Sequence, residues 1–202
     1  MARLFGIVII CLVASAASQP ARTAKTYPFN FVSRQQWGAR PPASTFGRLT
    51  SPVPFVVVHH SYIPPACATT DVCKRNMRQM QAAHQLTNGW QDIGYNFAVG
   101  GDGSVYEGRG WEAVGAHAIG YNFQSIGIVM IGDFVSNLPP ANQLQTLKDF
   151  IATGVELGYI SPNYRLIGHR QATATECPGR ALFNEISTWP HFINKQIVVE
   201  IY

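Results

Sequence analysis

Two residue types that bind zinc lie eight positions apart near the end of the chain: His169 follows an apolar stretch, and Cys177 precedes a Pro-Gly turn. Neutral imidazole and thiolate are both good zinc ligands. Two ligands do not make a site, and the best third candidate is His59, which follows the apolar residues 55–58. We predict that His59, His169 and Cys177 hold one Zn²⁺ ion with the fourth position open, as in catalytic rather than structural zinc sites.

Two simpler interpretations of these residues remain open at this point. A closed structural zinc site would need a fourth protein ligand; His60 is the obvious spare, although adjacent residues on a strand point to opposite faces. Cys177 could also be a buried, inert thiol. Cysteine counting favours a metal ligand, because Cys67 and Cys73 can form a small disulfide in an oxidising compartment and the fourth cysteine lies in the N-terminal leader.

Strand and helix signals alternate along the chain and predict one α/β domain. Strands are predicted over residues 55–58, 94–99, 104–107, 126–131 and 164–167, with a hairpin turn at residues 100–103. Helices are predicted over residues 72–87, between Pro140 and Gly158, and over residues 181–189. We expect a single domain over residues 32–195 with a central mixed β-sheet flanked by helices. The zinc site should lie at strand ends, in a groove.

The N-terminus has the pattern of a secretory signal. A charged start is followed by the apolar residues 4–14 and by small residues suited to cleavage, so we assign residues 1–18 to a signal peptide. A membrane anchor is the alternative, but the apolar run is too short to span a bilayer comfortably. We expect a secreted, extracellular protein with no membrane span. Residues 19–31 are predicted to be a flexible lead-in and residues 196–202 a C-terminal tail.

The composition predicts a folded protein with a mild basic excess. Of 202 residues, 47% are hydrophobic and 13% are charged, which favours one compact domain over disorder. The net charge of +4 comes without a Lys/Arg run, so it suits an anionic cell-wall surface, whereas nucleic acid would call for a denser basic stripe. Neither long predicted helix clearly shows the cationic amphipathic face of a membrane-disrupting protein.

Several short motifs taken together are more specific than the three proposed ligands. They are Val-Val-His-His-Ser at 57–61, Asp-Ile-Gly-Tyr-Asn-Phe at 92–97, Gly-Asp-Gly at 101–103, Tyr-Glu-Gly-Arg-Gly-Trp at 106–111, Gly-Ala-His-Ala at 115–118, Gly-His-Arg at 168–170 and Thr-Glu-Cys-Pro-Gly at 175–179. With these motifs the chain resembles the peptidoglycan recognition proteins, and more distantly the bacteriophage amidases, over residues 32 to about 192. The pair Cys67 and Cys73 also matches a small disulfide loop of that family.

The resemblance implies roles for individual residues. His59, His169 and Cys177 match the family's zinc ligands, and Tyr95 matches the tyrosine whose hydroxyl assists catalysis. Thr175 matches a position that is lysine in the phage enzymes and threonine in the active eukaryotic relatives. Members that only bind typically lack the cysteine, so its presence implies an active zinc amidase. The implied reaction is hydrolysis of the amide between N-acetylmuramic acid and L-alanine.

The resemblance also implies a substrate preference. In the family, a Gly-Trp pair before the Asp-Ile-Gly-Tyr motif and an arginine in Tyr-Glu-Gly-Arg-Gly accompany recognition of diaminopimelic acid, and this chain has Gly89, Trp90 and Arg109 there. Diaminopimelate differs from lysine by one carboxylate, which a guanidinium can clamp bidentately. We expect His117 and Asn122 to line the same groove; alternatively, His117 only holds its own loop.

We therefore predict a secreted, monomeric, zinc-dependent N-acetylmuramoyl-L-alanine amidase whose partners are bacterial peptidoglycan and muropeptides, acting in innate immunity. The alternative is a non-catalytic peptidoglycan pattern-recognition receptor with the same fold and groove. Cys177 argues against that alternative, because a receptor has no need of the third zinc ligand.

Overall fold

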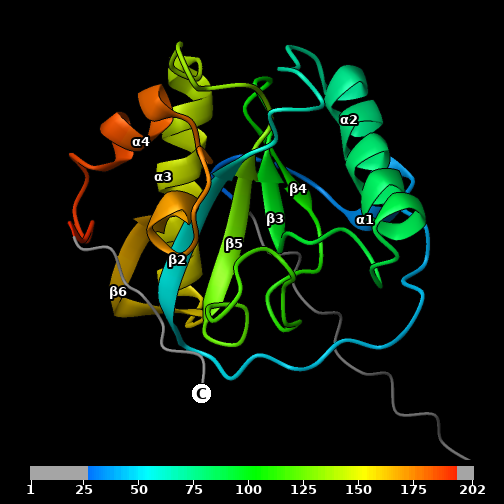
Figure 1. Cartoon of the computed structure of the whole chain (residues 1–202), viewed down its shortest axis with the longest axis horizontal. Coiled ribbons are helices and arrows are strands. Elements are labelled where there is room, and N and C mark those ends of the chain that lie inside the picture. Colours follow the sequence, from blue (N-terminus) through cyan, green and yellow to red (C-terminus); the bar gives the residue numbers. More distant parts are fainter. Residues whose placement is uncertain (1–26, 195–202) are drawn as a thin grey trace, which may run out of the picture.

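The computed structural model describes residues 27–194. Residues 1–26 and 195–202 are drawn in grey in Figure 1, so the predicted signal peptide, most of the lead-in and the C-terminal tail lie outside the described residues. Among residues 27–194 there is no helix with both the length and the apolar composition needed to cross a bilayer.

The centre of the domain is a mixed sheet, as the sequence predicts, and it has six strands. Its strands are β1 (Asn30–Val32), β2 (Val53–His60), β3 (Phe97–Val99), β4 (Ser104–Glu107), β5 (Ser125–Met130) and β6 (Ile160–Gly168), in the spatial order β1-β4-β3-β5-β2-β6. All neighbouring strands are parallel except β3 and β4, which form the predicted antiparallel hairpin. β2 therefore lies between β5 and β6, and these three neighbours are the longest strands of the sheet.

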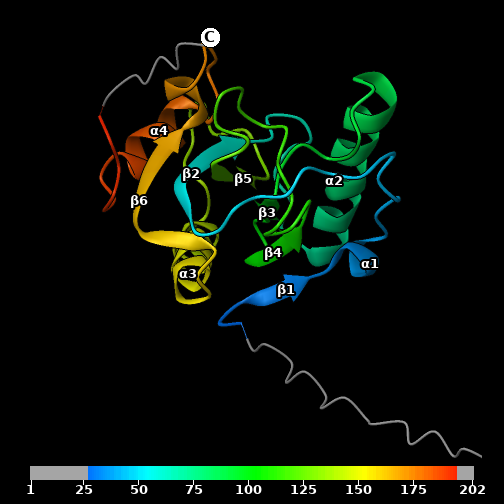
Figure 2. The same cartoon turned by 90° about the horizontal axis from the view of Figure 1, so that it is seen from below.

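Helices cover both faces of this sheet. They are α1 (Arg34–Trp37), α2 (Thr70–Ala82) with a π-helical continuation η1 (Ala83–Thr87), α3 (Ala141–Glu156), the short 3₁₀ turn η2 (His169–Gln171) and α4 (Arg180–Ile186). Figures 1 and 2 show α2 and α3 on opposite sides of the sheet. Glycine in a left-handed conformation follows α3, where Gly158 has φ +74°, and this ends the helix as predicted.

The core consists of apolar side chains between the sheet and these helices. Leu147 and Phe150 of α3 pack on one face, while Met77 and Met80 of α2 pack on the other. Each such buried side chain contributes on the order of 2 kcal/mol. β2 is buried along nearly its whole length because both faces and both edges are covered, which explains its unbroken apolar sequence at residues 55–58.

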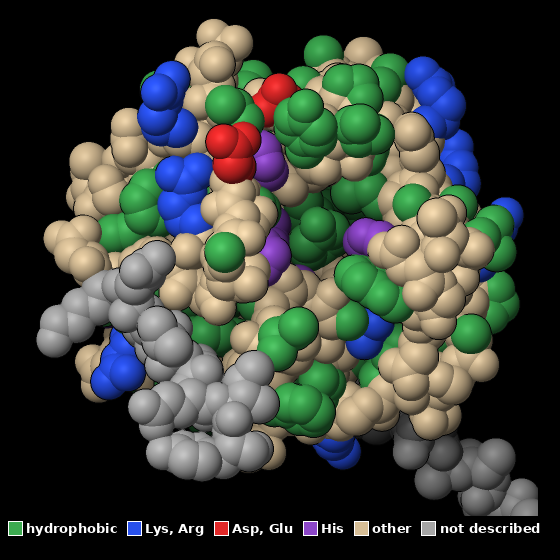
Figure 3. Space-filling view, viewed as in Figure 1, with side chains coloured by type: hydrophobic (Ala, Val, Ile, Leu, Met, Phe, Trp, Pro, Cys, Tyr) green, Lys and Arg blue, Asp and Glu red, His purple; other side chains and the backbone are tan. Residues whose placement is uncertain are grey.

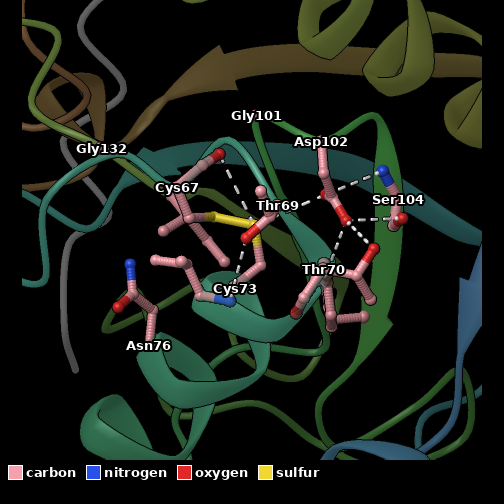
Figure 4. Close-up of a disulfide and its surroundings, with 12 residues drawn as sticks. Cys67, Thr69, Thr70, Cys73, Asn76, Gly101, Asp102, Ser104 and Gly132 are labelled. Atoms are coloured by element: carbon pink, nitrogen blue, oxygen red, sulfur yellow. Dashed lines mark hydrogen bonds between the residues drawn. A yellow bond between two sulfur atoms is a disulfide. The ribbon is translucent and has the colours of Figure 1, made fainter.

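The disulfide between Cys67 and Cys73 is present and fastens the start of α2. By the chain-entropy argument, closing so short a loop contributes about 2 kcal/mol. Figure 4 shows Asp102 beside this bond; its carboxylate accepts hydrogen bonds from the Thr70 hydroxyl (2.8 Å) and from the Ser104 backbone and hydroxyl (3.1 and 2.9 Å). The carboxylate therefore ties α2 to the β3–β4 hairpin.

Several element boundaries differ from the predictions. Residues 30 and 31, assigned to the flexible lead-in, belong to β1, where Asn30 Nδ2 donates to Ser104 Oγ at 2.8 Å. This correction has a clear cause, because the strand is formed by pairing with β4, more than seventy residues away. The strand predicted over 94–99 begins at Phe97, and the helix predicted over 181–189 ends at Ile186.

Candidate metal centre and substrate groove

The three predicted ligands converge at the carboxyl ends of β2 and β6. Val58 pairs with Gly168 in the parallel register, so the next residue of each chain segment, His59 and His169, lies at the same edge of the sheet. Their ring centroids are 4.4 Å apart. Ligand atoms of His59, His169 and Cys177 all lie within 4.8 Å of one another, which confirms the predicted convergence.

The donor set fits a zinc ion. Tetrahedral zinc with bonds of about 2.0–2.3 Å places neighbouring ligand atoms roughly 3.3–3.8 Å apart, and the distance from Cys177 Sγ to His59 Nδ1 is 3.7 Å. Within residues 27–194 no fourth His, Cys, Asp or Glu joins this group. His60, the spare considered from the sequence, instead accepts the backbone N–H of Phe134 at Nδ1 (3.2 Å).

Burial sets the protonation states of these groups. Desolvation and the neighbouring His117 lower the pKa of His59 well below its usual value, and desolvation lowers the pKa of His169 to about 4. Both imidazoles are therefore neutral at pH 7, which is the state that binds a metal. Burial raises the pKa of the Cys177 thiol to about 12, so its sulfur keeps a proton until a cation replaces it.

Backbone contacts hold the loop that carries Cys177. The N–H of Arg170 donates to the Cys177 carbonyl (2.8 Å), and Arg170 Nη2 donates to the Glu176 carbonyl (2.6 Å). Gly179 has φ +90°, and a side chain there would collide with the backbone of Phe134. The loop is thus pinned on both sides of the sulfur, which fixes the ligand's position before any ion binds.

A hollow of about 480 Å³ opens over the cluster, and Tyr95 and Thr175 both line it. Figure 3 shows histidine side chains along the walls of the hollow on this face. The ring of Tyr95 lies 5.2 Å from that of His59, centroid to centroid. Burial and the nearby Cys177 raise the pKa of Tyr95, so its hydroxyl remains a hydrogen-bond donor. Both residues predicted to act in catalysis therefore line the same hollow as the candidate ligands His169 and Cys177.

A second hollow of about 490 Å³ contains four of the five predicted substrate residues: Gly89, Trp90, Arg109 and Asn122. Arg109 is held rigidly, because its Nε donates to the Ile93 carbonyl (2.7 Å) and its Nη1 to the Val114 carbonyl (2.8 Å). Its guanidinium also stacks over Phe46 at 4.7 Å. Among residues 27–194 the hydrogen bonds of this guanidinium are made by Nε and Nη1, which leaves Nη2 to bind an anion.

His117, the fifth of these residues, lies elsewhere. Its side chain does not line either hollow; it is buried, with 8% of its surface exposed, and its Nδ1 lies 3.0 Å from His59 Nε2. The ring lies behind the candidate ligand His59, with its Nδ1 on the side of His59 Nε2. Asn122 Oδ1 accepts the N–H groups of His117 and Ala118 (2.8 and 2.9 Å), so Asn122 holds this loop. Sequence spacing gave no sign of either contact.

Comparison with known proteins agrees with this geometry. The family model described as N-acetylmuramoyl-L-alanine amidase matches residues 49–180, more than half of the chain, and the matched stretch includes all three candidate ligands. The chain belongs to this amidase family. The resemblance to peptidoglycan recognition proteins is confirmed by relatives and structures alike.

Two curated members of the amidase family illustrate the match. Peptidoglycan-recognition protein LB of Drosophila melanogaster is 54% identical over 161 residues, covering 80% of this chain and 69% of that protein. The human N-acetylmuramoyl-L-alanine amidase is 47% identical over 161 residues, which are 79% of this chain but only 28% of the human protein. The alignment thus covers most of the first relative and a minor part of the second.

Solved structures of family members have the same fold. The wild-type Drosophila PGRP-LB structure matches with a TM-score of 0.80 at 53% identity, covering 81% of this chain and 96% of that one. A structure of peptidoglycan recognition protein LE in complex with tracheal cytotoxin, a monomeric diaminopimelic acid-type peptidoglycan, matches with a TM-score of 0.80 at 46% identity. It covers the same shares of the two chains.

Proposed function

We propose that this protein is a secreted, zinc-dependent N-acetylmuramoyl-L-alanine amidase that binds and cuts diaminopimelate-type bacterial peptidoglycan in innate immunity. The observation that carries the proposal is the meeting of two imidazoles and one thiol within 4.8 Å, of which His169 and Cys177 line an open hollow. Membership of the amidase family supports the reaction class. The relative in complex with a diaminopimelic acid-type fragment supports the substrate class.

Each group has a defined task in this reaction. Bound Zn²⁺ would supply Lewis acidity, polarising the scissile carbonyl and lowering the pKa of a water molecule. His59, His169 and Cys177 would hold the ion and leave one position open. Tyr95 keeps its proton because burial raises its pKa, so its O–H can donate to the negative charge that develops on the carbonyl oxygen. Thr175, exposed at the rim of the same hollow, offers a second O–H.

The reaction is tested by digesting diaminopimelate-type muropeptides and analysing the products by mass spectrometry, with and without a chelator. Free stem peptide and peptide-free glycan should form without chelator, and addition of Zn²⁺ to the chelated protein should restore them. Retention of intact muropeptides under all conditions, with binding preserved, would favour the pattern-recognition receptor over the enzyme.

Zinc binding at pH 7 is expected to release about one proton per protein. Cys177 is protonated beforehand because burial raises its pKa to about 12, and it must lose that proton to ligate. His59 and His169 release none, because their lowered pKa values keep them neutral. Calorimetric titrations in two buffers of different ionisation enthalpy give the count. A release near zero would remove the thiol from the ligand set.

The Arg109→Ala substitution is expected to weaken binding of diaminopimelate-type fragments by about 2 kcal/mol, roughly thirtyfold, and to change little for lysine-type fragments. The guanidinium is fixed by two backbone carbonyls, and its remaining N–H groups suit the extra carboxylate. Calorimetry with matched fragment pairs measures the difference. Because Arg109 also braces the Ile93 and Val114 carbonyls, thermal unfolding serves as the control, and equal losses on both fragments would refute the clamp.

A further inference from the structure

The outer side of the His59 ring faces a second histidine. His59 Nδ1 points to the ligand cluster, 3.7 Å from Cys177 Sγ, so Nε2 is its remaining polar atom. That atom lies 3.0 Å from His117 Nδ1, and the two rings meet edge to face with centroids 5.0 Å apart. Two imidazole nitrogens at this distance share one hydrogen, so one ring donates and the other accepts.

The direction of this bond follows from the role of His59. A histidine that binds a metal through Nδ1 must carry its hydrogen on Nε2, so His59 donates and His117 Nδ1 accepts. The hydrogen of neutral His117 is then on Nε2, which lies 3.4 Å from Ser125 Oγ. Ser125 in turn donates its own hydrogen to the Tyr121 carbonyl at 2.7 Å. The chain of donors therefore runs in one direction and ends on a backbone acceptor.

The fold builds a closely fitting slot for the His117 ring. A side chain at Gly115, or at Gly127 in the middle of β5, would collide with the imidazole, so both positions must be glycine for the ring to lie there. Ser125, at the start of β5, is fully buried. His117 is buried and its backbone is held by Asn122, and among the described residues neither ring nitrogen has an alternative partner.

We infer that His117 and Ser125 are positioning residues that hold His59 in the tautomer whose Nδ1 lone pair faces the metal. The inference rests on the proposed zinc site and deepens it. Metal-binding histidines usually donate their second N–H to a carboxylate, carbonyl or water, and loss of that partner typically costs 10–100-fold in metal affinity. Here the partner is another imidazole, whose own tautomer is set by a serine.

The test compares two nearly isosteric substitutions, His117→Leu and His117→Asn. Leucine removes the acceptor, so the buried Nε2–H of His59 has no partner and the other tautomer, donating from Nδ1 to Cys177, becomes favourable. Asparagine can place an oxygen near the position of Nδ1 and keep the acceptor. We expect His117→Leu to weaken zinc binding by about 10–100-fold and His117→Asn to stay within about threefold of wild type.

A second readout needs no metal. Nitrogen NMR of the zinc-free protein should show His59 protonated at Nε2 in wild type and in His117→Asn, and at Nδ1 in His117→Leu. If His117→Leu does not fold, Ser125→Ala takes its place, since it removes one oxygen and should shift zinc affinity and the His117 tautomer in the same direction. Ser104→Ala, at another buried serine of the sheet, is the matched control and should change neither.

Three results would overturn the inference. First, His117→Leu could have the same zinc affinity and the same His59 tautomer as wild type. That result would show that the contact does not set the tautomer. Equal losses in His117→Leu and His117→Asn would assign the effect to packing of the ring. If the wild-type protein itself binds no zinc, the proposed metal site fails as well, whereas normal wild-type binding with unaffected variants removes only the positioning role.

Discussion

Replacing Cys177 by serine is expected to reduce muropeptide cleavage by at least about a thousandfold and to leave peptidoglycan binding intact. A neutral hydroxyl is a poor zinc ligand, and the two remaining imidazoles cannot complete the site. Binding should persist because the second hollow, which contains Trp90 and Arg109, includes no part of the Cys177 loop. The variant thus separates chemistry from recognition.

Zinc content, stem-peptide release and calorimetric binding of a muropeptide test this expectation together. Wild-type protein stripped by a chelator should match the variant, and added Zn²⁺ should rescue only the wild type. Ser187→Ala, at the end of α4, provides a variant outside the site. If the serine variant released stem peptide at a near-normal rate, Cys177 would not be a functional zinc ligand and the proposed role of the thiolate in the metal site would be wrong.

Replacing Tyr95 by phenylalanine is expected to lower kcat by about 10²–10³-fold while KM and zinc affinity stay near wild type. The substitution removes one buried O–H in the hollow above the cluster and keeps the ring that lies 5.2 Å from His59. The hydroxyl is a donor at neutral pH because burial raises its pKa, so its loss should act on the transition state rather than on the bound substrate.

Tyr62→Phe is the matched control for Tyr95→Phe. Tyr62 lines the same hollow but is largely exposed, so its hydroxyl exchanges hydrogen bonds with water. Steady-state kinetics on one muropeptide should show a large loss in kcat for Tyr95→Phe and a small one for Tyr62→Phe. A loss of similar size in both variants, or one confined to KM, would assign Tyr95 to substrate binding.

The metal cluster was predictable because its parts are carried by strong local signals. Apolar runs end at His59 and just before His169, and the Pro-Gly turn after Cys177 marks a fixed loop. Sequence spacing alone did not show that these segments meet. The meeting depends on β2 pairing with β6 in a register that only the folded sheet defines.

Other features had no local signal. Residues 30 and 31 of β1 fall in the predicted lead-in because so short a strand carries little pattern, and the strand is formed by contacts with the distant β4. The position of His117 depends on two glycines, Gly115 and Gly127, of which one lies on a different element. In the sequence alone, Gly127 reads only as a small residue within a predicted strand. Contacts between segments that are distant in the sequence are therefore the features that could not be predicted from it.

The pairing of Val58 with Gly168 also bears on how the protein should respond to loss of zinc. Because adjacent buried strands already hold the two imidazoles together, these two candidate ligands are placed when the chain folds, before any cation binds. Removal of zinc should thus stop the proposed amidase reaction without unfolding the protein. Added zinc should then restore that reaction in the same molecules.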